Sequence, residues 1–363
     1  MACFTISFNL AAIIAVIPTI SRELGFSDLA VSKILSYYYL PYGLAALIYA
    51  PLTRYFSYAR IYFYSMVVYV ISSVTCGVTT SLDFLCWARG LMAIAAAGII
   101  PLGLMLIGEF FEKKVRGKLV GFFFGCAFIG SFAGMLTAGF FNWRWLFYVP
   151  AILGFLLAVI CFFLRFGLLA KIHGVRINYW RSLTDVKVIQ IFVFIFLISF
   201  LYHGVSTWYG IYLDRMYSLD KFHISGILTL TLIVSIFGQN FGGYLSDKHG
   251  RLWTTYLGVI GLGLSTMLLF GHYSLGILIM ILLLISLFWT IGHNATSTIL
   301  TDFSNEQRAV IASLNSSVRF VSAGLGFLAS RVFIQQSFKL TFLVIGILIV
   351  LLSSIINYSL RES

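Results

Sequence analysis

Residues 274–301 read SLGILIMILLLISLFWTIGHNATSTILT, a stretch without a single aspartate, glutamate, lysine or arginine. A helix of about 20 predominantly apolar residues is long enough to cross the hydrocarbon core of a bilayer. The stretch is longer than that and has no charge to keep it in water. It therefore predicts a membrane-spanning helix.

The rest of the chain has the same apolar character. Hydrophobic residues make up 60% of the 363 residues and charged residues only 10%, whereas a soluble domain carries about 25% charged residues. So few charges cannot cover a water-soluble core of this size. The composition predicts an all-α polytopic membrane protein. It excludes nucleic-acid-binding modules, soluble enzymes and secreted disulfide scaffolds. The five cysteines lack metal-ligand spacing, so we expect neither a metal nor a cofactor.

Apolar runs of membrane-spanning length recur along the whole sequence. Short polar turns bound most of them. The run that begins at Cys3 lacks a basic start and a small-residue cleavage site, so it is interpreted as a first span and not as a signal peptide. The usual short basic tail before that span is missing, which would fit a clipped or alternative start. We predict twelve spans: 3–20, 31–52, 59–79, 82–108, 117–140, 143–165, 187–213, 222–245, 252–271, 274–301, 309–334 and 338–360.

The distribution of basic residues predicts the orientation of these spans. Fifteen of the 24 lysines and arginines lie in alternate turns and at the C-terminus, and six lie in the opposite turns. Loops rich in lysine and arginine stay on the cytoplasmic side. Both termini are therefore expected in the cytoplasm, and the protein in a bacterial inner membrane.

The sequence also predicts two similar halves. The segment 166–186 is the longest polar stretch and lies midway along the chain, so it is expected to be a cytoplasmic linker. It separates a first six-helix half, residues 1–165, from a second, residues 187–363. Landmarks in the two halves repeat at an offset of 192 or 193 residues. Paired halves with a site between them near the bilayer midplane are typical of transporters.

The most specific motif is Gly243-Tyr244-Leu245-Ser246-Asp247-Lys248-His249-Gly250-Arg251, directly after the predicted span 222–245. It resembles the cytoplasmic loop signature of the major facilitator superfamily. Gly243 would allow close helix packing, and Gly250 would supply the positive φ of a tight turn. Asp247 would meet a positive helix N-terminus in the other half, beside Lys248, while Arg251 would pair with an acid such as Asp302. The matching loop of the first half is degraded, because Arg54 stands where the aspartate is expected.

Other motifs extend the resemblance over nearly the whole chain, most closely to the twelve-helix drug:proton antiporter branch. Pro18–Gly25 is similar to the exit of span 1, and Asn142–Phe147 to the external corner before span 6. Glu109, Arg116 and, in the second half, Arg308 are similar to the conformational-switch motif. Arg89 is similar to the arginine of span 4. The glycine-proline pair of antiporters on span 5 is absent, which weakens the prediction of export.

Charged and titratable groups inside spans are the first candidates for a substrate or coupling site, because they are costly there. Arg89 could hold span 1 and take part in proton coupling, or it could be a structural bridge. Arg319 could attract an anion, or it could be structural. No span core contains an aspartate or glutamate. His203 and His293 are therefore the candidates for a proton site, in spans that the resemblance places at the central cavity.

Four further residues complete the candidate site. Asn9 and Asn294 could form hydrogen bonds in a cavity. Tyr38, in a tyrosine-rich stretch, and Trp208 could form an aromatic wall for a lipophilic substrate. Ordinary packing explains both aromatic residues equally well.

The combined prediction is a secondary active transporter that works by alternating access as a monomer in the lipid bilayer. It would export a small amphipathic organic molecule (a drug, sugar or metabolite), with protons as candidate coupling ions. One alternative is an organic-anion transporter or a facilitator. Another is a non-transporting membrane sensor or an intramembrane enzyme. The sequence has no phosphate-binding loop and no hydrolase motif, which argues against ATP-driven transport and enzymatic activity.

Overall fold

The structure is a computed structural model that describes residues 1–163, 179, 184–301 and 308–360. These residues form helices and short connections, without a β-strand among them. The helices are α1 (Ala2–Leu10), α2 (Ala12–Leu24), α3 (Asp28–Val31), α4 (Lys33–Leu52), α5 (Tyr58–Val78), α6 (Leu82–Ala96), α7 (Ile99–Phe110), α8 (Lys113–Phe140), α9 (Trp145–Phe163), α11 (Val186–Ser206), α12 (Tyr209–Tyr217), α13 (Lys221–His249), α14 (Arg251–Leu268), α15 (Leu275–Thr301), α16 (Arg308–Ile334), α17 (Phe338–Leu352), the short 3₁₀-helix η1 (Ser353–Ile355) and α18 (Ile356–Leu360).

The helical, polytopic membrane fold predicted from composition is confirmed. Within the described residues, nine helical segments are long and apolar enough to cross a membrane, and the bent pair α1–α2 makes up to ten. The two other predicted spans, 31–52 and 252–271, correspond to the helices α4 and α14. Both helices are less apolar, because α4 contains Lys33 and several tyrosines and α14 begins with Arg251. The count of twelve spans stays a prediction.

Several of the predicted spans are broken helices, among them the first and the fourth. The first bends by 48° between α1 and α2, at Ala11. The predicted span 82–108 breaks between α6 and α7, where the hydroxyl of Tyr49 donates a hydrogen bond to the carbonyl of Ile94 (2.8 Å). A side-chain donor that satisfies a helix carbonyl removes the need for the regular backbone bond at that point.

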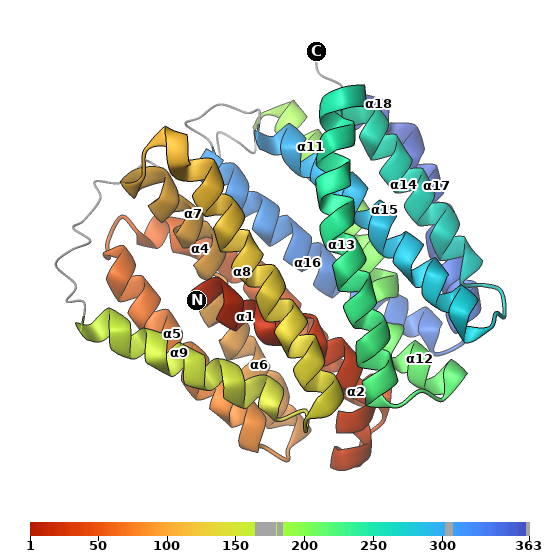
Figure 1. Cartoon of the computed structure of the whole chain (residues 1–363), viewed down its shortest axis with the longest axis horizontal. Helices are drawn as coiled ribbons and strands as arrows, with labels where there is room; N and C mark the ends of the chain where they lie inside the picture. The colour runs from red at the N-terminus through yellow and green to blue at the C-terminus, as the bar shows by residue number, and fades with distance from the viewer. Residues whose placement is uncertain (164–178, 180–183, 302–307, 361–363) are drawn as a thin grey trace.

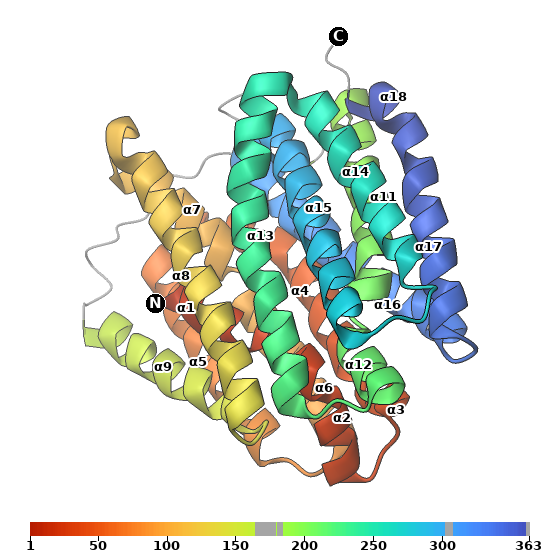
Figure 2. The ribbon, with the colours of Figure 1, turned by 45° about the vertical axis from the view of Figure 1, so that its right-hand side comes forward.

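The helices gather into two sets, α1–α9 and α11–α18, which pack against each other through α4 with α16, α8 with α13, and α2 with α12. Figures 1 and 2 show α8 and α13 close together at one end and separated at the other. At the close end the rings of Phe140 and Phe222 lie 5.3 Å apart, and Lys221 Nζ donates to the carbonyl of Phe141 (2.7 Å). We call this end the Glu23 end (residues 22–28, 141–145 and 214–221) and the opposite one the Asp247 end (residues 53–57, 110–116 and 246–251).

Close contact between the two sets depends on a glycine. Gly210 in α12 faces the backbone carbonyl of Ile14 in α2, and a Cβ atom at position 210 would overlap with that oxygen. Only glycine allows two helix backbones to approach this closely. The contact therefore fixes α2 against α12 near the Glu23 end.

The predicted linker, residues 166–186, lies mostly outside the described residues. Tyr179, from within it, donates its hydroxyl to the carbonyl of Leu47 at the end of α4 (2.9 Å). The division into halves at residues 165 and 187 stays a prediction. The two helix sets, α1–α9 and α11–α18, are the structural counterparts of the two predicted halves.

Candidate functional site

Arg89 lies in the closed interior of the first helix set. Its side chain is 1% exposed, and Nη1 donates to Oδ1 of Asn9 on α1 (3.2 Å) and contacts the sulfur of Met92 (3.8 Å). The guanidinium carbon lies 4.2 Å from the ring centroid of Tyr38 on α4. Such a cation–π contact gains strength where water is excluded. Arg89, Asn9, Met92 and Tyr38, the Arg89 cluster, therefore connect three helices around a buried cation.

Arg319 lies in the second helix set and has different surroundings. Nε donates to Oδ1 of Asn315 (2.9 Å), one helical turn earlier on α16, and Nη2 donates to Oγ of Ser297 on α15 (3.1 Å). Both acceptors are neutral. Nη1 has no hydrogen-bond partner among the described residues, and the side chain is only partly buried. Arg319 is thus a cation held by two polar side chains that do not neutralise it.

A pocket opens beside Arg319, between α11, α14, α15 and α16. Most of its wall is apolar, and its polar groups are few. The cavity is small in this conformation, with a volume of about 10 Å³, which is room for about one water molecule. Residues that line it include Ile198, Phe288, Trp289, His293, Thr296 and Arg319. We refer to Arg319, Asn315, Ser297, His293 and Trp289 as the Arg319 cluster.

Aromatic rings cover one side of the Arg319 cluster. Trp289 stacks flat on Tyr202 of α11, with ring centroids 3.8 Å apart and an angle of 5° between the planes. The Trp289 ring also lies 5.6 Å from His293 and 5.8 Å from His203. From the other helix set, the ring of Tyr39 on α4 lies 6.2 Å from His203. The rings of the two histidines predicted from the sequence therefore both lie within 6 Å of one tryptophan ring.

The hydrogen bonding of His203 determines which ring nitrogen is open. Nδ1 lies 2.8 Å from the backbone carbonyl of Ser199, one helical turn earlier. A carbonyl oxygen only accepts hydrogen bonds, so Nδ1 carries the proton in the neutral ring. Nε2 is then the nitrogen at which His203 could gain a second proton.

Asn294 and Trp208 lie apart from both clusters in this conformation. Asn294 lies against α13, where a Cβ atom at Gly243 would come 3.8 Å from its side-chain oxygen. Trp208 is fully buried between α11 and α12, donates Nε1 to Oγ of Ser330 (2.8 Å) and stacks on Phe327. Neither side chain belongs to the Arg89 or Arg319 cluster.

The loop at the Asp247 end has the predicted geometry in part. Gly250 separates α13 from α14 with φ of +87°, the positive value predicted for this glycine. Asp247 and Lys248 are exposed. Asp247 has no ion-pair or hydrogen-bond partner among the described residues. The meeting of Asp247 with a helix of the other set stays a prediction.

The other switch residues are described only in part. Arg116 Nε donates to the carbonyl of Phe111, within the same short connection at the start of α8 (2.7 Å). Asp302, the predicted partner of Arg251, lies outside the described residues, as do the side chains of Glu109 and Arg308. Their predicted roles are therefore not tested.

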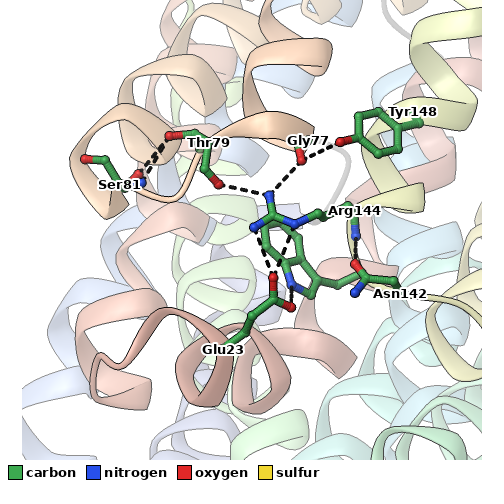
Figure 3. Close-up of polar contacts among 8 residues, drawn as sticks. Glu23, Gly77, Thr79, Ser81, Asn142, Arg144 and Tyr148 are labelled. Carbon is green, nitrogen blue, oxygen red and sulfur yellow. Dashed lines mark hydrogen bonds and ion pairs between the residues drawn. The ribbon is translucent and has the colours of Figure 1, made fainter.

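At the Glu23 end, two stretches singled out in the sequence meet. Glu23 accepts hydrogen bonds from Trp143 Nε1 (2.6 Å) and from Arg144 Nη2 (3.0 Å), while Arg144 Nη1 donates to the carbonyls of Gly77 and Thr79 (Figure 3). A guanidinium with several donors in a fixed plane suits such a junction. The junction connects α2, the end of α5 and the start of α9 within the first helix set.

Two ion pairs at the same end connect the two helix sets. Arg22 Nη1 lies 2.8 Å from Oδ1 of Asp214, and Arg215 Nη2 lies 2.7 Å from Oδ2 of Asp28. Neighbouring residues of α12 thus pair with an arginine and an aspartate of the first set. No ion pair between two described residues joins the two sets at the Asp247 end.

Sequence reasoning missed several residues of the Arg319 cluster and both of these ion pairs. Helical spacing could have indicated the cluster, since Trp289, His293 and Ser297 recur every four residues on one face of α15. Asn315 precedes Arg319 by the same interval. The two ion pairs at the Glu23 end each join residues that are far apart in the sequence, by 192 and 187 positions, so no local sequence pattern indicated them.

The described residues contain no cluster of histidine, cysteine, aspartate or glutamate suited to a metal ion. The side chains of the Arg319 cluster could instead form hydrogen bonds and charge contacts with a small molecule. Aromatic rings on one side and a cation on the other would hold a ring and a polar group at once.

Comparisons with known proteins place the chain in a family. The chain is 23% identical over 332 residues to the uncharacterized MFS-type transporter YbcL of Bacillus subtilis, covering 88% of this chain and 84% of that protein. It is 25% identical to the multidrug transporter protein MdtP of the same organism over 177 residues, which is 48% of this chain and 30% of MdtP. It is 31% identical to the puromycin resistance protein pur8 of Streptomyces alboniger over 140 residues, which is 37% of this chain and 28% of pur8.

Solved structures have the same fold. A bacterial homolog of the human lysosomal transporter Spinster, in an inward-facing and unoccupied conformation, superposes with a TM-score of 0.78 at 15% identity, covering 99% of this chain and 94% of that one. The nucleoside transporter NupG superposes with a TM-score of 0.76 at 13% identity, covering 100% and 98%. The sequence model of the Major Facilitator Superfamily matches residues 1–327 and 191–362. The chain therefore belongs to the major facilitator superfamily of membrane transporters.

Proposed function

We propose that the protein exports a small amphipathic organic compound from a bacterial cell by alternating access. The observation that carries the proposal is the asymmetry between the two ends. Two ion pairs join the helix sets at the Glu23 end, predicted to face outward, and α8 and α13 separate toward the Asp247 end (Figure 2). This arrangement corresponds to an inward-open state without substrate, from which an exporter binds its cargo on the cytoplasmic side.

The two ion pairs are weak enough to open during a transport cycle. Arg22 and Arg215 are about half exposed, with side-chain exposures of 60% and 44%. The aspartate partners are only 18% and 15% exposed, so each pair contributes on the order of 1 kcal/mol, near the upper end for surface pairs. Binding of a substrate could outweigh such a bias and shift the population toward the outward-open state.

The names of the relatives support an organic cargo. Several of them are multidrug or resistance transporters. The rings of Tyr202 and Trp289 beside the polar groups of the Arg319 cluster would suit a molecule with a ring and a polar group once the small cavity between them widens.

Proton antiport is the proposed coupling, and it needs a group that changes charge inside the protein. The histidines that flank Trp289 are the proposed groups, since no acid lies in a predicted span core. In His203 the nitrogen that could take up a proton is Nε2, because Nδ1 donates to the carbonyl of Ser199.

Transport in proteoliposomes tests the proposal. Purified protein would be reconstituted and assayed with a panel of fluorescent amphipathic compounds, with and without an imposed pH difference. We expect saturable flux above protein-free vesicles for at least one compound. A membrane sensor or an intramembrane enzyme would give no flux.

A reversible crosslink tests the mechanism. A Cβ atom at Gly139 on α8 would lie 3.3 Å from Cβ of Ser225 on α13, close to the separation of about 3.5–4.5 Å found in disulfides. The double variant Gly139→Cys, Ser225→Cys should lose its flux when oxidised and regain it when reduced. The two single variants are the controls. Full flux with the bridge formed would contradict opening at the Glu23 end.

A further inference from the structure

Arg319 is a cation without an acidic partner in the interior of a membrane protein. The ion pairs between described residues involve Arg22, Arg144, Arg215 and His223, all at the Glu23 end. The hydrogen-bond acceptors of Arg319 are the neutral side chains of Asn315 and Ser297. An uncompensated cation at membrane depth is costly, and such residues generally mark a binding site or an ion pathway.

The Arg319 cluster has the geometry of an open anion receptor. Asn315 and Ser297 hold Nε and Nη2, which fixes the plane of the guanidinium and leaves Nη1 without a partner among the described residues. A guanidinium held in one plane presents parallel N–H groups to the oxygen atoms of a carboxylate, sulfonate or phosphate. His293 lies on the same pocket wall and can add a further N–H.

The side chains around the cavity suit the rest of an amphipathic anion, and the cavity, at about 10 Å³, has to widen to admit it. Trp289, backed by the stacked ring of Tyr202, and Phe288 give it a flat aromatic wall. None of the residues lining the pocket is an aspartate or glutamate. A cationic compound would therefore find a repelling charge and no counter-charge.

We propose that the Arg319 cluster binds the anionic group of the transported compound, and that the cargo is an aromatic organic anion. The proposal rests on the transport function proposed above and names its substrate class. Arg319 would contact the acidic group of the cargo, and Trp289 would pack against its ring.

An anionic cargo also fits the direction of transport. The cytoplasm is electrically negative, so the membrane potential favours the exit of an anion. At 100 mV, the energy of one charge corresponds to about a fiftyfold concentration ratio. Export of an anion thus gains driving force from the potential in addition to any exchange of protons.

Binding of two matched probes tests the proposal. The probes are 1-naphthalenesulfonate and (1-naphthylmethyl)trimethylammonium, which have the same ring and permanent charges of opposite sign. Binding to the purified full chain in nanodiscs would be measured by calorimetry. We expect the wild-type protein to bind the sulfonate at least about tenfold more tightly than the ammonium compound.

Variants locate the site. Arg319→Gln should weaken binding of the sulfonate about tenfold or more, because the charged donor is lost. Arg319→Lys keeps the charge but loses the planar donors, so it should give an intermediate affinity. Arg331→Gln, the same charge change on the same helix, is the matched control and should bind like the wild type. Should Arg319→Gln fail to fold, Ser297→Ala should still weaken sulfonate binding severalfold.

The outcomes separate this proposal from the proposed transport function. Equal affinity for both probes, or unchanged sulfonate binding in Arg319→Gln, would overturn the anion site. Failure of the wild-type protein to bind the sulfonate would overturn it as well. Flux of any other compound would leave the transport function standing in these cases. Sulfonate binding that needs Arg319, in a protein without flux of any compound, would support the site and refute the transporter.

Discussion

The two arginines in the interior of the protein, Arg89 and Arg319, have opposite surroundings. Arg89 is 1% exposed, lies over the ring of Tyr38 and is connected to Asn9 on another helix. Arg319 is partly buried beside a small cavity, and its acceptors are Asn315 of its own helix and Ser297 of α15. The difference fits the proposal that Arg319 serves recognition, whereas Arg89 serves packing.

The largest expected effect is a difference in stability between variants of the two arginines. Arg89→Ala should lower the free energy of unfolding by about 3 kcal/mol, because it leaves a cavity between three helices and removes the donor to Asn9. Arg319→Ala should cost less than about 1 kcal/mol, because its side chain lines an existing pocket. Thermal melting followed by size-exclusion chromatography in detergent would measure both. Equal losses would remove the distinction between the two clusters.

Proton coupling gives a second difference between the Arg89 and Arg319 clusters, because both histidine candidates lie near Arg319 and neither contacts Arg89. The double variant His203→Gln, His293→Gln should retain substrate exchange and lose uphill transport driven by a pH difference, by about tenfold or more. Uptake into proteoliposomes with an imposed pH step would measure it. Undiminished accumulation would show that the histidines do not couple protons, and Asp28, Glu109 and Asp302 would be tested next.

The asparagine next to each arginine gives a smaller effect. Asn9→Ala removes the described acceptor of the buried Arg89 guanidinium and should lower stability by about 1–2 kcal/mol. Asn315→Ala should leave stability within about 0.5 kcal/mol of the wild type, because its Arg319 partner faces a pocket. Melting temperatures would compare them. A greater loss in Asn315→Ala would reverse the assignment of the structural and the recognition cluster.

The smallest effect concerns the tyrosine beneath Arg89. The buried hydroxyl of Tyr38 has no hydrogen-bond partner among the described residues, whereas that of Tyr69 donates to the carbonyl of Thr5 (3.1 Å). Tyr38→Phe keeps the ring under the cation and should be neutral or stabilising by up to about 1 kcal/mol. Tyr69→Phe should destabilise by about 1 kcal/mol. Thermal melting of the two variants is the measurement. Equal losses of stability would show that the Tyr38 hydroxyl also forms a stabilising interaction.

The sequence predicted the helical membrane fold because this depends on composition and on the length of apolar runs. It also predicted Arg89, Arg319 and the two histidines as candidates, since charged or titratable groups in apolar runs are visible without a structure. It could not separate Arg89 from Arg319, because their partners, Asn9 and Ser297, come from other helices.

Contacts between distant segments were beyond the reach of sequence patterns. The bend at Ala11 has no proline or glycine to mark it. The ion pairs of Asp214 and Arg215 with the first helix set depend on how α12 packs on α2 and α3, and polar residues at the ends of spans are too common to indicate such pairs. The buried hydrogen bond of Trp208 to Ser330 joins residues 122 positions apart, so no local pattern indicated it.

Transport of a single anionic probe tests the central claim most directly. Proteoliposomes would be given a potassium diffusion potential with valinomycin, positive inside, and the uptake of 1-naphthalenesulfonate would be followed for the wild-type protein, Arg319→Gln and Arg331→Gln. We predict that the wild-type protein and Arg331→Gln accumulate the sulfonate, toward a limit of about fiftyfold per 100 mV. Arg319→Gln should remain near protein-free vesicles. Equal accumulation by Arg319→Gln, or none by the wild-type protein, would contradict the account.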